Sequence, residues 1–112
     1  MNREEMLKRL RAGEDPLDLS IEKWEDVVDH LNKIQTKEEF DSRLEEGHKN
    51  CALCEVYNID GCLGCPVRRV TGAEGCLFTP WTDWVVAKEA GSLQDMREVA
   101  IKELLFLRSL KR

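Results

Sequence analysis

The stretch at residues 15–34, DPLDLSIEKWEDVVDHLNKI, decides the fold. Asp15 is a favoured helix cap and Pro16 suits a first helical turn, so a helix is predicted to begin here. Its apolar residues recur at spacings of four and three, which places them on one helical face. They are Leu17, Ile21, Trp24, Val28 and Leu31, widened by Val27 and Ile34. Most charged residues of the stretch, including Lys23, are expected on the opposite, solvated face.

Similar start and stop signals predict helices on the N-terminal side of the chain. A short helix is expected between Asn2, as its cap, and Gly13, which ends it. Thr36 and Glu39 have the spacing of a capping box, so a third helix is predicted to run from there to Gly47.

Two more helices are predicted after residue 79. Thr79 and Pro80 give the first a cap and a first-turn proline, and Gly91 ends it. Ser92 and Asp95 then start a last helix. Its inward-facing residues are predicted to be Leu93, Met96, Val99, Ala100, Leu104 and Leu107. The expected fold class is mainly α: a small helical bundle with a metal-stapled, loop-rich cysteine segment inserted between helices.

Length and composition predict one folded domain. The chain has 112 residues, of which 42% are hydrophobic and 35% charged, as is typical of a globular protein. Residues 1–47 would supply N-terminal helices, residues 48–79 the cysteine segment and residues 80–112 the C-terminal helices. The net charge is −5 and the acidic excess lies in residues 1–50, which argues against a broad phosphate-binding surface.

The hydropathy pattern indicates no contact with a membrane. No apolar run approaches the roughly 20 residues that span a bilayer, and the first residues lack the apolar stretch of a signal peptide. We therefore expect a cytoplasmic protein.

All five cysteines fall between residues 51 and 76, with the spacing C-x2-C-x7-C-x2-C-x10-C. The surrounding residues 48–79 follow no helical period and contain four of the seven glycines. Loops of this length rarely occur in a compact domain without another organising element. We therefore expect something other than packing, such as a metal ion, to organise the segment.

Structural zinc is the leading interpretation of the cysteines. Two C-x-x-C turns can supply a tetrahedral four-sulfur shell, from Cys51, Cys54, Cys62 and Cys65. Cys76 would then be spare or replace one of these ligands. A closed site of this kind contributes to folding and leaves no open coordination position, so it is not catalytic.

Three other interpretations use the same segment. An iron–sulfur cluster also takes four cysteines, and Pro66 after Cys65 is suggestive of one. Disulfides would staple the loop, but they are rare in reducing cytoplasm and five cysteines leave one unpaired. A thioredoxin-like pair normally opens a helix within an α/β pattern, which the sequence does not indicate. His48 could replace a cysteine ligand, although an exposed histidine at a helix end is the simpler interpretation.

The motif order resembles a set of small uncharacterised phage and prokaryotic proteins. SIEKWEDV is followed by C-x-x-C, C-x-x-CP, TG, a further cysteine and TPW, over most of residues 17–84. The matching residues are Trp24, Cys51, Cys54, Cys62, Cys65, Pro66, Thr71, Gly72, Cys76, Pro80 and Trp81. The resemblance implies no activity or substrate, but it implies that all five cysteines act as one unit.

The predicted function is that of a non-enzymatic module whose metal-stapled loop contacts a protein or nucleic-acid partner. No nucleophile with its base and no phosphate-binding glycine loop is recognised. Arg68 and Arg69, directly after the second C-x-x-C, are the predicted partner-binding residues. The alternative is a cluster-bearing or thiol-redox protein that uses the same cysteines.

Overall fold

Helices make up most of the part of the chain that the computed structural model describes, residues 1–45, 50–57, 65–71 and 79–111. The α-helices are α1 (Arg3–Arg11), α2 (Pro16–Lys33), α3 (Ala52–Tyr57), α4 (Pro66–Thr71), α5 (Pro80–Ala90) and α6 (Leu93–Ser109). Two 3₁₀ turns, η1 (Lys37–Glu39) and η2 (Ser42–Leu44), follow α2. These four ranges contain no strand. The predicted mainly α fold class is therefore confirmed.

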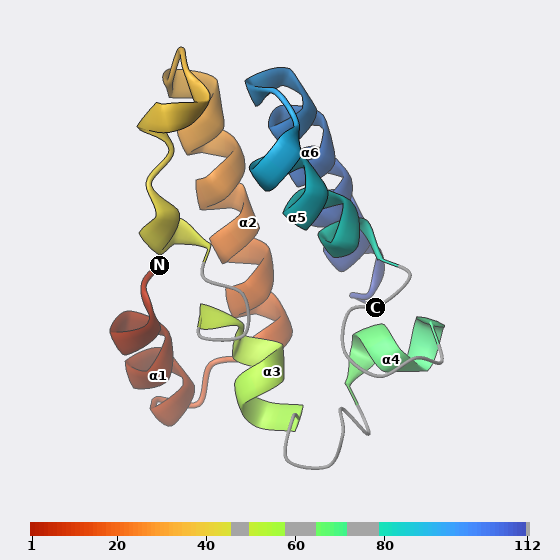
Figure 1. Cartoon of the computed structure of the whole chain (residues 1–112). Helices are drawn as coiled ribbons and strands as arrows, with labels where there is room; N and C mark the ends of the chain where they lie inside the picture. Colours follow the sequence, from red (N-terminus) through yellow and green to blue (C-terminus); the bar gives the residue numbers. More distant parts are fainter. Residues whose placement is uncertain (46–49, 58–64, 72–78, 112) are drawn as a thin grey trace.

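The long helices α2, α5 and α6 form the centre of the molecule (Figure 1). α6 packs against both α2 and α5, and α3 packs against both α2 and α1. Figure 1 shows α1 and α3 near the N-terminal end of α2, so the start of the cysteine segment lies beside the first half of that helix.

The start and the end of α1 and the start of α2 lie where the sequence predicts them. The Asn2 side chain accepts a hydrogen bond from the Glu5 N–H at 2.8 Å, and Asp15 accepts one from the Leu17 N–H at 2.8 Å. Gly13 follows α1 with φ at 92°, a conformation that glycine adopts without the steric cost of a side chain. These local signals fix both helices before any tertiary contact is considered.

A sharp turn at Gly91 joins α5 to α6. A Cβ atom there would lie 2.8 Å from the Ala87 carbonyl oxygen, so any larger residue would force the backbone at the end of α5 to shift. The helix start predicted at Ser92 and Asp95 is confirmed, and it takes the form of a capping box: Ser92 accepts from the Asp95 N–H at 3.2 Å, and Asp95 accepts from the Ser92 N–H at 3.1 Å. Thr79 caps α5 by accepting from the Trp81 N–H at 3.3 Å.

The core lies between α2 and the α5–α6 pair and extends to the cysteine segment. Its buried residues are Leu17, Ile21, Trp24, Val27, Leu31, Ile34, Leu53, Cys65, Val67, Trp84, Ala87, Met96, Ala100, Leu104 and Leu107. The predicted stripe on α2 is thus the buried face, with Val28 half-buried at its edge. A second, smaller cluster joins α1, α2 and α3 through Met6, Leu19 and Ala52.

The helix predicted from Thr36 to Gly47 is wrong over the described residues, because η1 and η2 take its place. The Thr36 side chain makes no capping hydrogen bond, and the Glu39 carboxylate accepts instead from the Gln35 N–H at 3.0 Å. Phe40 turns inward between the two turns, where its ring centroid lies 5.5 Å from that of Trp84. Phe40 is half-buried in this position, and its packing on Trp84 takes the place of a continued helix.

The loop-like segment predicted over residues 48–79 contains two short helices. Cys51 directly precedes α3, and its carbonyl accepts from the Glu55 N–H at 3.0 Å. Cys65 directly precedes α4, and its carbonyl accepts from the Arg69 N–H at 3.1 Å. Each helix is too short to show an apolar period, which is why the sequence pattern did not reveal it.

Candidate functional site

The structure describes three of the five predicted ligands. Cys51 and Cys54 lie at the start of α3 and are partly buried, whereas Cys65 lies at the start of α4 and is buried in the core. Cys62, Cys76 and the alternative ligand His48 lie outside the described residues. The structure therefore describes both cysteines of the first C-x-x-C motif and the second cysteine of the other, each at the start of a helix.

Cys51 and Cys54 interact directly. The Cys54 backbone N–H donates to the Cys51 sulfur at 3.3 Å, so the Cys51 side chain caps α3 as a serine would. A hydrogen bond from the Cys54 side chain lowers the pKa of the Cys51 thiol to about 6, with help from the charge of Lys23 and against the effect of burial. Cys51 therefore favours the thiolate form, which is the form that binds metals and attacks disulfides.

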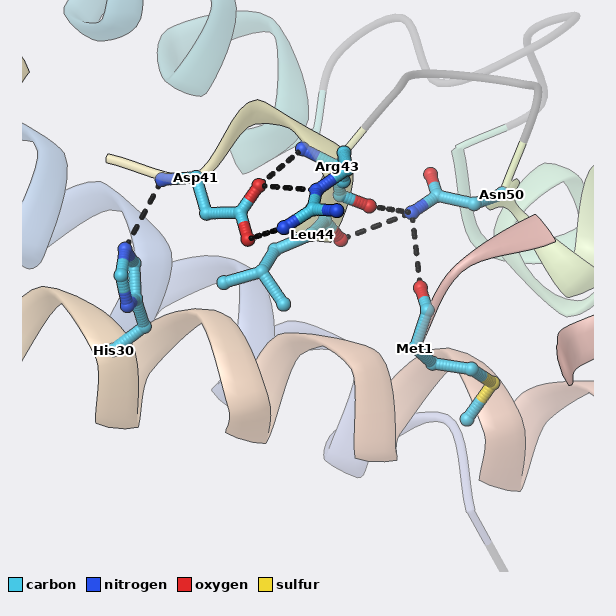
Figure 2. A network of polar contacts seen from close by, with 6 residues as sticks. All are labelled: Met1, His30, Asp41, Arg43, Leu44 and Asn50. Carbon is cyan, nitrogen blue, oxygen red and sulfur yellow. Dashed lines mark hydrogen bonds and ion pairs between the residues drawn. The ribbon is translucent and has the colours of Figure 1, made fainter. Parts of the chain in front are cut away.

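Asn50 fixes the position at which the cysteine motif begins. Its side chain is buried, and Figure 2 shows its amide nitrogen among three backbone carbonyls. These belong to Met1 at 3.3 Å, Arg43 at 3.4 Å and Leu44 at 2.9 Å. The amide thus ties the chain terminus and η2 to the residue that precedes Cys51.

The turns that carry Arg43 and Leu44 are themselves held to α2. The Asp41 N–H donates to the His30 ring nitrogen at 3.1 Å, and the Asp41 carboxylate pairs with Arg43 (Figure 2). His30 is half-buried and lies at the boundary between the core and the surface of α2. These contacts hold the cysteine segment to the core by hydrogen bonds that involve no sulfur.

A buried polar cluster, which we define as Lys23, Glu45, Trp84 and Glu103, lies near Cys51. The Lys23 ammonium is 3.3 Å from one Glu45 oxygen, and the Trp84 indole N–H donates to the other at 3.3 Å. Lys23 also lies over the ring of Trp24 at 5.3 Å. The prediction that Lys23 is solvated is therefore wrong, because its side chain is only 4% exposed.

Glu103 is the unusual member of this buried polar cluster. It is 4% exposed, and its Oε2 atom has no hydrogen-bond partner among the described residues. Burial raises the pKa of Glu103 from an ordinary 4.5 to about 7. The positive charge of Lys23 opposes this rise, and the negative charges of Cys51 and Glu45 add to it. Near neutral pH the buried carboxyl group is therefore partly protonated.

This pKa predicts the effect of Glu103→Gln on stability. Because the folded-state pKa is raised, folding favours the protonated acid, and stability falls as the pH rises from about 4.5 to about 7. Glutamine keeps the shape without the charge and should raise the free energy of unfolding by about 1–3 kcal/mol at pH 8. At pH 4 the variant and the parent should agree.

Urea unfolding at matched pH and metal content measures this difference. The variant and the parent share Cys51, whose lowered pKa gives stability that is lost as the pH falls through about 6. Subtracting the two unfolding free energies at each pH removes that common effect. A difference that does not change between pH 4 and pH 8 would contradict the assigned state of Glu103.

Cys51 and Cys54 are the described cysteines that lie side by side. The hydrogen bond between Cys51 and Cys54 places a lowered-pKa thiol beside a second thiol, as a metal-binding turn requires. Across the described ranges, no three His, Cys, Asp or Glu side chains are grouped so that they could hold a metal ion. The described residues therefore bring Cys51 and Cys54 together but do not group Cys65 with them, and Cys62 and Cys76 lie outside the described ranges.

The remaining predicted residues lie on α4 and in the core. Arg69 is exposed and Arg68 half-buried, both in the last turn of α4. Trp24 and Trp84 pack edge to face in the core with ring centroids 5.2 Å apart, which confirms the predicted burial of Trp24.

Sequence reasoning missed the buried polar cluster and Asn50. Glu103 carries a weak signal, because it falls between Ala100 and Leu107 on the inward face of the last helix. Lys23 similarly lies one helical turn from Leu19 and from Val27, which are both buried. No sequence pattern predicts the role of Asn50, since its hydrogen-bond partners are backbone carbonyls, which every residue has.

Comparison with known proteins adds no assignment. No match is found among protein-family models, curated proteins or solved structures. In the described ranges, every helix is too short or too polar to cross a bilayer.

Proposed function

We propose that this chain is a small non-enzymatic metal-binding protein whose paired C-x-x-C motifs hold a structural zinc ion. The observation that carries the proposal is the hydrogen bond from the Cys54 N–H to the Cys51 sulfur at 3.3 Å. Together with the C-x-x-C spacing, it presents two sulfurs at the start of one short helix. The ligands are Cys51, Cys54, Cys62 and Cys65, with Cys76 as the spare or substituting thiol.

The surroundings of α3 support a structural role for the metal. Ala52 and Leu53 are buried, and Asn50 is anchored by three backbone carbonyls. The helix therefore meets the core directly, so a metal bound beside it would stabilise the packed state. Such a site contributes its binding free energy to folding.

The test is metal analysis of protein purified without oxygen. We expect about one zinc per chain in the parent and a large loss of zinc in Cys51→Ser and Cys54→Ser. Cys76→Ser is the matched control, because it should keep zinc if Cys76 is the spare. Zinc retained in Cys51→Ser and in Cys54→Ser would overturn this ligand set.

The alternative is an iron–sulfur or thiol-redox protein, and a specific observation favours it. Cys51 and Cys54 open a helix, and the pKa of the Cys51 thiol is about 6, two properties shared by reactive thiol pairs. Iron and sulfide in the purified protein, with absorption at about 400 nm, would establish a cluster, since zinc has no such absorption band. Two thiols per chain that oxidise and reduce reversibly in metal-free protein would establish a redox pair.

We further propose that Arg68 and Arg69 contact the partner of this module. They share the last turn of α4, next to the second C-x-x-C. Arg68→Glu/Arg69→Glu should keep its zinc and helicity but lose binding to an acidic protein surface or to nucleic acid. Affinity purification of tagged parent and variant, with and without nuclease, separates the two classes. Identical partner sets from both proteins would contradict the assignment.

A further inference from the structure

The outer face of α6 carries an apolar stripe between two charges. Ile101 is 42% exposed and Leu105 is 55% exposed, although both are large aliphatic residues. With Glu98 and Arg108 they are spaced by three, four and three residues, so all four lie along one line of the helix. We call these four residues, Glu98, Ile101, Leu105 and Arg108, the outer seam.

The outer seam is separate from the core contacts of α6. The opposite face of the helix supplies the buried residues Met96, Ala100, Leu104 and Leu107 to the packing with α2 and α5. Within the described ranges, the other large hydrophobic residues that are exposed lie on α3, α4 and α5, one on each helix: Val56, Val70 and Val86. Single exposed aliphatic residues are common, but two neighbouring ones on the same face of a helix indicate an interaction surface.

When the outer seam is reversed, each charged residue faces a residue of opposite charge and each aliphatic residue faces the other aliphatic residue. In an antiparallel pair of α6 helices centred near position 103, Ile101 faces Leu105 of the partner subunit. Glu98 then faces Arg108 of the partner subunit. A two-fold axis repeats both contacts, as a closed dimer requires. A parallel pair would instead place equal charges together, Glu98 on Glu98 and Arg108 on Arg108.

We propose that the outer seam is a self-association surface through which two copies of this chain pair in an antiparallel arrangement. Four aliphatic side chains leave water in the pair, and four charged side chains form two opposite-charge contacts at its ends. This proposal concerns α6 alone and is independent of the metal ion.

The charged ends are accessible for such contacts. Arg108 pairs with Glu25 at 3.0 Å, but both side chains remain about half exposed. Glu98 accepts from Gln94 through one carboxylate oxygen at 3.1 Å, which leaves the other oxygen for an arginine. Lys102 flanks the seam, and its flexible stem can direct its charge to solvent. A single helix pair buries little area, so the dimer should be weak.

Sedimentation equilibrium of the full chain across a wide concentration range provides the first test. The parent should show a reversible monomer–dimer equilibrium, whereas Leu105→Glu should weaken dimerisation by about tenfold or more. Val70→Glu is the matched control, because Val70 is 63% exposed and belongs to α4 rather than to the outer seam. A parent that stays monomeric at the highest concentration, or a dimer that Leu105→Glu leaves intact, overturns the proposal.

Charge reversal tests the antiparallel register. Glu98→Arg and Arg108→Glu should each dimerise poorly, because each places equal charges opposite one another across the two-fold axis. An equimolar mixture of the two variants should form a heterodimer, since all its end contacts join opposite charges. Circular dichroism checks that both variants fold. Folded variants whose mixture associates no better than either alone would rule out this register.

Discussion

Replacement of Lys23 by methionine should lower the free energy of unfolding by about 3–5 kcal/mol at pH 7. Lys23 is buried, and its ammonium lies 3.3 Å from Glu45. It is also the positive charge that acts on Glu103. Methionine has a similar length, so the core stays filled while two carboxyl groups lose their counter-charge. Each must then stay buried without compensation or take up a proton.

The pH dependence of Lys23→Met separates this cause from a packing defect. The loss of stability should be largest at pH 8 and smaller at pH 5, where Glu103, whose pKa is already raised to about 7, can take up a proton. Lys33→Met is the matched control on the same helix, because Lys33 is 72% exposed and pairs with Asp29 in solvent. Its effect should be a small fraction of that at Lys23. Equal effects in chemical denaturation would refute the assigned role of Lys23.

The helices could be predicted because their signals are local. Asn2, Asp15, Thr79 and Ser92 each accept a hydrogen bond from an N–H two or three residues onward. Such caps depend on neighbours in sequence and persist whatever the tertiary structure does. The helix expected after Thr36 failed for the opposite reason, since burial of Phe40 against Trp84 outweighed its local capping pattern.

The buried polar cluster could not be predicted because its partners are distant in sequence. Lys23 and Glu45 are separated by 22 residues, and Trp84 lies 39 residues beyond Glu45. Helical periodicity assigns a lysine to the solvent unless a counter-charge in the fold is known. Only the tertiary structure therefore shows that Glu45 neutralises Lys23 inside the core.

The buried polar cluster also connects the core to the candidate metal site. Lys23 favours the Cys51 thiolate, while Glu45 opposes it. A substitution in this cluster would change both the stability of the helices and the charge felt at Cys51. We therefore expect Lys23→Met to lower zinc affinity as well as stability, because metal binding requires the thiolate form.

Replacement of Trp84 by leucine should cost about 3–5 kcal/mol of unfolding free energy. The Trp84 side chain is fully buried, and its ring contacts both Trp24 and Phe40. Leucine leaves a cavity between α5 and α2 and removes the N–H group that donates to Glu45. The change should appear as a lower midpoint of chemical denaturation with little change in helix content.

Trp84→Phe separates the hydrogen bond from the aromatic packing. Phenylalanine keeps a ring near Trp24 but cannot donate to Glu45, so its cost should be smaller, about 1–3 kcal/mol. Glu45→Met removes the acceptor for the indole together with the charge beside Lys23. A double-mutant cycle of Trp84→Phe and Glu45→Met should give a non-zero coupling energy, because each change alone removes the same hydrogen bond. Strict additivity would show that Trp84 stabilises the fold by packing alone and that its N–H contributes nothing to holding Glu45.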